Sequence, residues 1–140
     1  MDQCTICPRL CQADRVLTKG ICLAGPEPVV AKVMLHLWEE PFISGDTGSG
    51  AIFFSGCNLR CVFCQNWEIS QSRPEDFDTP FVAPAAIVGS ASARQSPIVA
   101  FTYNEPTVFL EYLADTAALA KKQKLRCVMI SCGFMNTEPL

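Results

Sequence analysis

Residues 51–67 read AIFFSGCNLRCVFCQNW, an apolar run that leads directly into Cys57, Cys61 and Cys64 with the spacing C-x3-C-x2-C. Cysteines of a packed core would lie on a regular strand or helix, whereas these three follow the turn-forming residues Ser55 and Gly56 and are interleaved with polar Asn58 and Arg60. A disulfide framework is disfavoured because the chain has nine cysteines, an odd number. Neighbouring thiols at this spacing therefore indicate a metal. Three thiolates on one loop can ligate three irons of a cubane cluster, which leaves the fourth iron open to a small molecule.

These residues carry a family resemblance. Residues 55–67, with the aromatic Phe63 directly before the third cysteine, resemble the signature loop of the radical S-adenosylmethionine (radical SAM) enzymes. The Cys-Gln-Asn run that begins at Cys64 resembles most the branch related to pyruvate formate-lyase activating enzymes, which includes AmmeMemoRadiSam-type proteins. The resemblance extends from Cys4 to Leu140.

The resemblance implies a reaction and its cofactors. Cys57, Cys61 and Cys64 would ligate a [4Fe-4S] cluster whose open iron is chelated by S-adenosylmethionine. One electron from the reduced cluster would cleave this cofactor to a 5'-deoxyadenosyl radical, which abstracts hydrogen from a substrate. An electron donor such as flavodoxin or ferredoxin is then expected. The substrate is unknown, and one candidate is a partner protein that receives a glycyl radical.

The rest of the chain predicts alternating strands and helices. Apolar runs at 97–103 and 127–130 are typical of strands, whereas 83–94 and 106–124 are typical of helices. Each apolar strand, beginning with 51–54, is followed by polar or reactive residues. In parallel α/β barrels the functional residues gather at the C-terminal ends of the strands, so we expect the three following loops to share one pocket.

The expected fold class is therefore α/β. By resemblance, residues 28–140 form the N-terminal half of a partial parallel (β/α)6 TIM-like radical SAM barrel, and residues 1–27 form a small cysteine-rich segment. A barrel of this kind takes on the order of 200 residues or more, so this chain of 140 residues is expected to be truncated after the first three strands. We expect the chain alone to be poorly stable or inactive unless a partner supplies the missing half, because an exposed strand edge promotes aggregation.

The resemblance also assigns contacts to the cofactor. Asn104 and Glu105 stand where many family members have a Gly-Gly-Glu-Pro segment, so we expect Glu105 to bind the methionyl amino group with help from Asn104. Phe63 would shield the cluster and lie against the adenine, and Ser131 would contact the ribose. Relatives usually have Asn where this chain has Cys132, which is a departure beside the ribose contact. The residues alone leave open a helix cap for Asn104 and a first-turn carboxylate for Glu105.

The N-terminal segment contains a second group of cysteines. Cys4, Cys7, Cys11 and Cys22 fall within nineteen residues that show little hydrophobic periodicity. A metal that holds the loop together is the best explanation, because such sites supply folding energy to segments too small to fold alone. We expect zinc with four thiolates, and a second iron-sulfur cluster is the alternative.

Two other residues are harder to assign. Cys127 lies within an apolar run, and we expect it in the core. His36 is the single histidine and ends the strand-like run 29–36, before Glu39, Glu40 and Pro41. A hydrogen-bonded structural residue and a proton donor both remain open for His36, since the pKa of histidine suits either role.

The composition limits the function classes. The chain is 49% hydrophobic and 18% charged, with a net charge of −3, and contains no apolar run of membrane-spanning length. The sequence pI near 5.1 lacks the basic footprint of a nucleic-acid binder. Abundant free thiols favour the cytoplasm. We therefore expect a cytoplasmic radical SAM oxidoreductase or a fragment of one. The alternative is a non-catalytic cysteine-rich module that binds zinc or an iron-sulfur cluster and acts in protein interaction.

Overall fold

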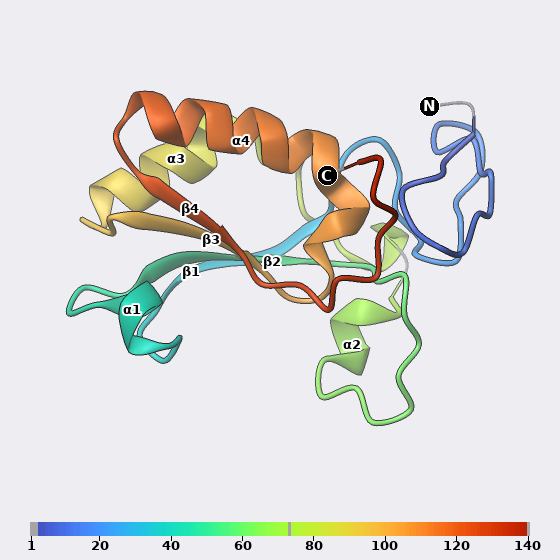
Figure 1. Cartoon of the computed structure of the whole chain (residues 1–140), viewed down its shortest axis with the longest axis horizontal. Helices are drawn as coiled ribbons and strands as arrows, with labels where there is room; N and C mark the ends of the chain where they lie inside the picture. The colour runs from blue at the N-terminus through green and yellow to red at the C-terminus, as the bar shows by residue number, and fades with distance from the viewer. Residues whose placement is uncertain (1–2, 73, 140) are drawn as a thin grey trace.

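The computed structural model describes residues 3–72 and 74–139, which form an α/β fold (Figure 1). The strands are β1 (Val30–His36), β2 (Ser49–Phe54), β3 (Ile98–Thr102) and β4 (Arg126–Met129). The α-helices are α1 (Pro41–Ser44), α2 (Trp67–Ser70), α3 (Pro84–Ala93) and α4 (Leu110–Lys122), and the 3-10 helices are η1 (Pro74–Asp76) and η2 (Pro106–Phe109).

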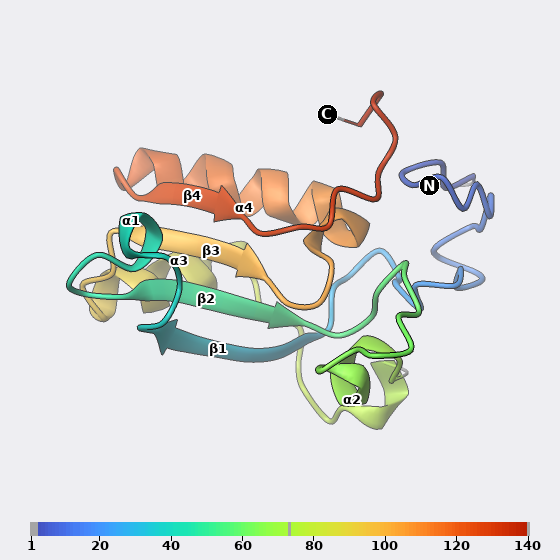
Figure 2. The ribbon, with the colours of Figure 1, turned by 60° about the horizontal axis from the view of Figure 1, so that its bottom comes forward.

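The four strands form one sheet in the order β1-β2-β3-β4. β1 pairs antiparallel with β2, whereas β2, β3 and β4 run parallel, with Ala51 opposite Ala100 and Ala100 opposite Val128. The parallel strands therefore end at the same edge of the sheet, as the arrowheads in Figure 2 show. This mixed sheet is consistent with part of a radical SAM fold.

Helices α3 and α4 cover one face of the sheet (Figure 1). Buried Ile52 and Phe54 of β2 and Val99 of β3 belong to the same core cluster as Val88 of α3 and Phe109 of η2. Burying such side chains contributes about 1.5–3 kcal/mol each. The core therefore fixes β2 and β3, the two strands that carry the central loops.

Helix α4 has the amphipathic pattern that its position requires. Tyr112, Leu113, Thr116 and Ala120 recur at helical spacing and are buried, and Lys121 stands in the last turn, where a cation is favoured by the helix dipole. Residues facing solvent between them are charged or small. The predicted helix and its position after a strand are thus confirmed.

The other predicted elements are also present, with two differences. The helix expected at 83–94 is α3, and the strands expected at 97–103 and 127–130 are β3 and β4. Pro41 follows the strand-like run 29–36 and opens the one-turn helix α1, which was not predicted; its fixed φ suits the first helical position. Helix α2 was not predicted, since four residues are too few for a periodic signal.

The expectation that Cys127 is a core residue is wrong. Its side chain is exposed and lines an open apolar groove between β4 and α4 with Leu113 and Ala117. β4 is an edge strand of the sheet, so Cys127 has a neighbouring strand on one side only. Among the described residues, no helix has the length and apolar character to cross a membrane.

Residues 3–29 contain turns and loops without a helix or strand. Buried Arg15 ties this segment to the body of the chain, because its guanidinium donates to the carbonyl oxygens of Gly25 and Val108 and to the carboxylate of Glu111. Two hydrogen bonds from Asn136 to the backbone of residues 5 and 6 add a second attachment. Figure 1 shows the N-terminal segment beside the last residues of the chain.

Candidate metal and cofactor site

The loops that follow β2, β3 and β4 meet at one edge of the sheet (Figure 2). The side chain of Asn104, after β3, donates to the carbonyl oxygen of Phe54 at the end of β2 at 2.9 Å. Glu105 accepts a hydrogen bond from Ser131, after β4, at 2.7 Å. Asn58, after β2, donates to the carbonyl oxygen of Phe134 at 2.9 Å. The three loops therefore contact one another at this edge of the sheet, and the pocket that we expect them to share stays a prediction.

The three cysteines of the first loop differ in exposure. Cys57 is buried, Cys64 is half-buried and Cys61 is exposed. Burial is the main cause that raises the pKa of the Cys57 thiol to about 11; the N–H of Leu59 acts against it, and the charges of Glu105, Cys64 and Cys61 add to it. A metal bound at Cys57 must therefore displace a proton. The start of the loop is therefore sheltered, and its middle, at Cys61, faces solvent.

The backbone before Cys57 is fixed by Gly56, whose φ is +93°. A Cβ at this position would lie 2.5 Å from the carbonyl oxygen of Cys22, so only glycine fits without displacing the N-terminal segment. The N–H of Gly56 and the hydroxyl of Ser55 both donate to the carbonyl oxygen of Ile69. The loop thus begins from a fixed point against α2.

The arrangement of thiols fits a cluster better than a single ion. Among residues 3–72 and 74–139, no three Cys, His, Asp or Glu side chains converge tightly enough to ligate one metal ion. Zinc at about 2.3 Å from each sulfur would need thiolates roughly 3.8 Å apart, whereas a cubane places each ligated iron at a separate corner and spreads its thiolates. Three thiols and no fourth ligand on the loop are the donor set that a cubane with one open iron requires.

Glu105 is 1% exposed, and its carboxylate is occupied by this chain's own donors. One oxygen accepts from the N–H of Thr107 at 3.1 Å and the hydroxyl of Ser131 at 2.7 Å, and the other from the N–H and the thiol of Cys132 at 2.9 and 2.6 Å. Burial alone raises the pKa of Glu105, but these hydrogen bonds outweigh it and hold the pKa below its usual value. Glu105 is thus a charged clamp between two loops.

Asn104 offers the acceptor that Glu105 does not. Its Oδ1 is buried and has no hydrogen-bond partner in the described part of the chain, while its Nδ2 is used by the carbonyl oxygen of Phe54. A buried acceptor without a partner costs about 1–3 kcal/mol. This orphan oxygen, at the junction of two strand ends, is suited to a donor from a bound molecule.

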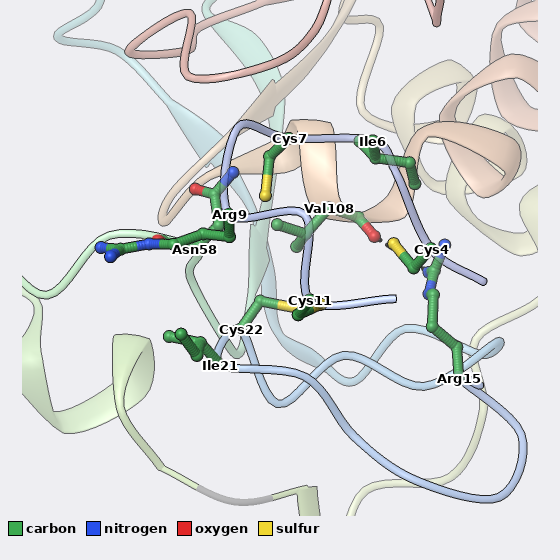
Figure 3. A pocket seen from close by; sticks show the side chains of 10 residues that line it. All are labelled: Cys4, Ile6, Cys7, Arg9, Cys11, Arg15, Ile21, Cys22, Asn58 and Val108. Atoms are coloured by element: carbon green, nitrogen blue, oxygen red, sulfur yellow. Dashed lines mark hydrogen bonds between the residues drawn. The ribbon is translucent and has the colours of Figure 1, made fainter. Parts of the chain in front are cut away.

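The N-terminal cysteines surround a cavity (Figure 3). Cys4, Cys7, Cys11 and Cys22 all line it, and in Figure 3 their sulfur atoms are turned toward a common space. Burial raises the pKa of the Cys22 thiol, which Cys4 and Cys11 raise further and Arg15 lowers. The sequence expectation that these four residues form one group is consistent with this placement.

Comparison with known proteins identifies the family. The pattern that defines the Radical SAM superfamily matches residues 51–140, a range that includes the cysteine loop and the loops after β3 and β4. The chain belongs to the radical SAM superfamily. Members of this superfamily are in general enzymes, and they typically use a [4Fe-4S] cluster and S-adenosylmethionine.

Two relatives from Methanocaldococcus jannaschii match the radical SAM chain. Uncharacterized protein MJ0808 is 31% identical over 99% of this chain and 45% of its own length. Uncharacterized protein MJ0674 is 43% identical over 49% of this chain and 19% of its own length. The chain thus spans less than half the length of these relatives. No solved structure matches it.

Phe63 and Ser131, which we expect at the cofactor, and His36, whose role the sequence leaves open, lie in different surroundings. Phe63 is 83% exposed, so its side chain is free to cover a ligand at the loop. Ser131 is half-buried and joins Glu105 and the N–H of Gly133. His36 pairs with Ser49 at the start of β2, about 17 Å along the strand from the cysteine loop at 3.4 Å per residue. Its Nδ1 lies 3.5 Å from the carboxylate of Glu39 and makes no hydrogen bond within the described residues, so the structural role and the proton-donor role both stay predictions.

Sequence reasoning did not find Arg15 or Gly56. Arg15 is a single charged residue in an irregular segment, and its burial depends on Gly25, Val108 and Glu111, which are distant in sequence. Gly56 was noted as a turn residue, but its contact with Cys22 joins two segments that no local pattern connects. The position of Arg15 and Arg9 among four cysteines was the one available signal.

Proposed function

We propose that this chain provides part of the catalytic domain of a radical SAM enzyme, in which Cys57, Cys61 and Cys64 ligate a [4Fe-4S] cluster. The observation that carries the proposal is the hydrogen bond of Asn104, whose Oδ1 has no partner among the described residues, to Phe54, three residues before Cys57, at the ends of the parallel strands. Ligands of α/β barrels bind at this edge of the sheet. The donor set leaves one iron for a small molecule.

Asn104 is the residue we propose for the methionyl amino group. An ammonium group has N–H donors and no acceptor, which complements the free Oδ1. Glu105, expected from the sequence to make this contact, has both oxygens engaged by Thr107, Ser131 and Cys132. Its negative charge still favours a cation nearby. We therefore assign Glu105 to holding the two loops together and Asn104 to direct contact.

The cluster would supply one electron for the cleavage of S-adenosylmethionine to a 5'-deoxyadenosyl radical. The chain contributes position and shelter. Cys57 fixes the inner edge of the cluster because it is buried, and Phe63, which is exposed, would close over the cluster and the adenine. Ser131 would contact the ribose.

Substrate and partners are proposed at the level of chemistry. The radical acts on a carbon-hydrogen bond, and activation of a partner protein of the glycyl-radical type is our first candidate substrate. Reduction calls for a low-potential one-electron donor such as flavodoxin or ferredoxin. Nine free cysteines suit the reducing cytoplasm. The branch related to pyruvate formate-lyase activating enzymes remains part of this proposal.

Anaerobic reconstitution with iron and sulfide tests the proposal. We expect absorbance near 400 nm and, with a reductant and S-adenosylmethionine, release of 5'-deoxyadenosine. Cys61→Ala should abolish the release, while Cys127→Ala, which removes an exposed thiol outside the site, should leave it unchanged. Bound zinc without a brown chromophore would instead support the non-catalytic module.

A further inference from the structure

The four N-terminal cysteines and two arginines, Arg9 and Arg15, enclose a cavity that the proposed reaction does not use. The cavity has a volume of about 20 Å³ and is lined by the four thiols together with Arg15 and apolar side chains such as Val108. A water molecule needs about 10–15 Å³ measured in this way. Figure 3 shows the sulfur atoms around this space. Four thiolates that bind one zinc ion at about 2.3 Å would leave no room for a water molecule between them. The cavity is therefore larger than a zinc site.

We propose that Cys4, Cys7, Cys11 and Cys22 bind a second [4Fe-4S] cluster, with one thiolate on each iron. Zinc, the metal that the sequence led us to expect, requires four tightly converging sulfurs. No three metal-ligating side chains among the described residues converge to that degree. A cubane takes the same four thiolates at wider spacing. Because every iron has a protein ligand, this cluster binds no substrate and serves structure or electron transfer.

Arg15 provides independent support for an anionic ligand in the cavity. It is 3% exposed, and four of its hydrogen bonds go to Glu111, Gly25 and Val108. Its Nε is also buried but has no partner in the described residues. A cubane with four thiolates carries net negative charge, and hydrogen bonds to its sulfurs tune its potential. The free N–H of Arg15 is available for such a bond.

Gly20 leaves room for one of the ligands. A Cβ at position 20 would lie 2.8 Å from the sulfur of Cys11, so a glycine is needed for this thiol to keep its position. Asn136 holds the segment before Cys7 in place, because its backbone N–H donates to the carbonyl oxygen of residue 6 and its side chain donates to that of residue 5. The ligands are therefore placed by the surrounding chain and not by the cysteine spacing alone.

The proposed second cluster lies next to the first. Asn58, one residue after Cys57, lines the cavity, and Arg9 donates from Nε to the carbonyl oxygen of Asn58 at 3.0 Å. The carbonyl oxygen of Cys22 packs against Gly56 on the other side. Cys22, a proposed ligand of the second cluster, thus adjoins the residue that directly precedes Cys57. This arrangement would let an electron from a low-potential one-electron donor pass from the second cluster to the first.

The test uses variants of the whole 140-residue chain that each retain the ligands of one site. Each variant is reconstituted anaerobically with ferrous iron and sulfide in the presence of equimolar zinc. A variant with Cys57, Cys61 and Cys64 all changed to Ala retains only the N-terminal ligands. We expect about four irons and four sulfides per chain and a [4Fe-4S] Mössbauer spectrum. One zinc per chain without iron, or no bound metal while circular dichroism remains native, would overturn the proposal.

A second variant makes the result independent of the first site. Cys7→Ala/Cys11→Ala should lose about four irons relative to the wild-type chain, which should bind about eight, and Cys127→Ala should keep all of them. If only the cluster at Cys57, Cys61 and Cys64 failed to form, the iron content of Cys7→Ala/Cys11→Ala would fall to near zero. The iron content of the triple variant would stay at about four per chain. Equal iron in Cys7→Ala/Cys11→Ala and wild type would contradict the proposal.

Discussion

Cys132 donates two hydrogen bonds to one oxygen of Glu105, from its backbone N–H at 2.9 Å and from its thiol at 2.6 Å. Burial, with the hydrogen bond to Glu105 as the next cause, raises the pKa of the Cys132 thiol to about 11, so this thiol remains a donor at neutral pH. The pair joins the loop after β3 to the loop after β4. Ser131 completes the connection from the other oxygen.

The depressed pKa of Glu105 predicts loss of stability in acid. A carboxyl whose folded pKa is below its unfolded value near 4.5 stabilises the fold above that pH, and the contribution is lost as the pH falls through the folded value. Urea unfolding from pH 7 to pH 3 should show a smaller decrease for Glu105→Gln than for wild type. Glu138→Gln, at an exposed residue, should follow wild type. Parallel curves for all three proteins would contradict the prediction.

At pH 7 the same Glu105→Gln variant should be less stable than wild type. The amide nitrogen cannot accept the hydrogen bonds that one carboxylate oxygen now accepts, and the lost charge weakens the others. A buried donor left unsatisfied costs about 1–3 kcal/mol. The free energy of unfolding from urea titration checks this value.

Two glycines form a matched pair for substitution by alanine. Gly56→Ala places a Cβ against the carbonyl oxygen of Cys22 at a φ of +93°, and should destabilise the chain by about 1–3 kcal/mol or more. Gly89→Ala, inside α3 with nothing within 4 Å of its Cβ, should stabilise it by about 0.5–1 kcal/mol. Urea denaturation measures both. A neutral Gly56→Ala would show that the two cysteine segments are not in contact.

Arg15 should be essential for the attachment of the N-terminal segment. Arg15→Gln leaves the carbonyl oxygens of Gly25 and Val108 without their donor, and should reduce stability by about 2 kcal/mol or more. Lys19→Ala removes an exposed ion pair with Glu75 and should cost about 0–1 kcal/mol. Limited proteolysis after the Arg15 substitution should cut first within residues 3–29. Equal protease resistance of both variants would be evidence against this attachment.

Asn104→Ala should weaken cofactor binding without removing the cluster. The substitution deletes the unpartnered Oδ1, and loss of one hydrogen bond to a charged donor corresponds to about 1.5–3 kcal/mol, or at least tenfold in the dissociation constant. Equilibrium dialysis with S-adenosylmethionine on reconstituted protein measures it, with iron content as the control. If Asn104→Ala bound S-adenosylmethionine as tightly as wild type, with the same iron content, the proposed contact of Asn104 with the amino group would be wrong.

The sequence predicted the elements whose signal is local. The apolar runs that became β2, β3 and β4 and the helices α3 and α4 were visible because periodicity and Pro at a first turn act within a few residues. The three-cysteine loop was visible through its spacing. Cys127 was misplaced because burial depends on which strand lies at the edge of the sheet, and sequence does not show this.

The details of the site depended on contacts between distant residues. That Glu105 is saturated by Thr107, Ser131 and Cys132 while Asn104 keeps a free oxygen follows from the meeting of loops about 27 residues apart. The spacing of the four N-terminal thiols depends on backbone contacts with other segments, such as that of Cys22 with Gly56. A spacing pattern indicates that a metal binds but not how far apart the sulfurs lie.

Electron paramagnetic resonance of the reduced Cys7→Ala/Cys11→Ala variant, with and without S-adenosylmethionine, tests the central claim most directly. This variant retains Cys57, Cys61 and Cys64 as the ligands of one cluster. The account predicts a reduced [4Fe-4S] signal whose g values change when the cofactor is added, because the cofactor binds the iron that lacks a protein ligand. A signal that the cofactor leaves unchanged, or the absence of a cluster in folded protein, would contradict it.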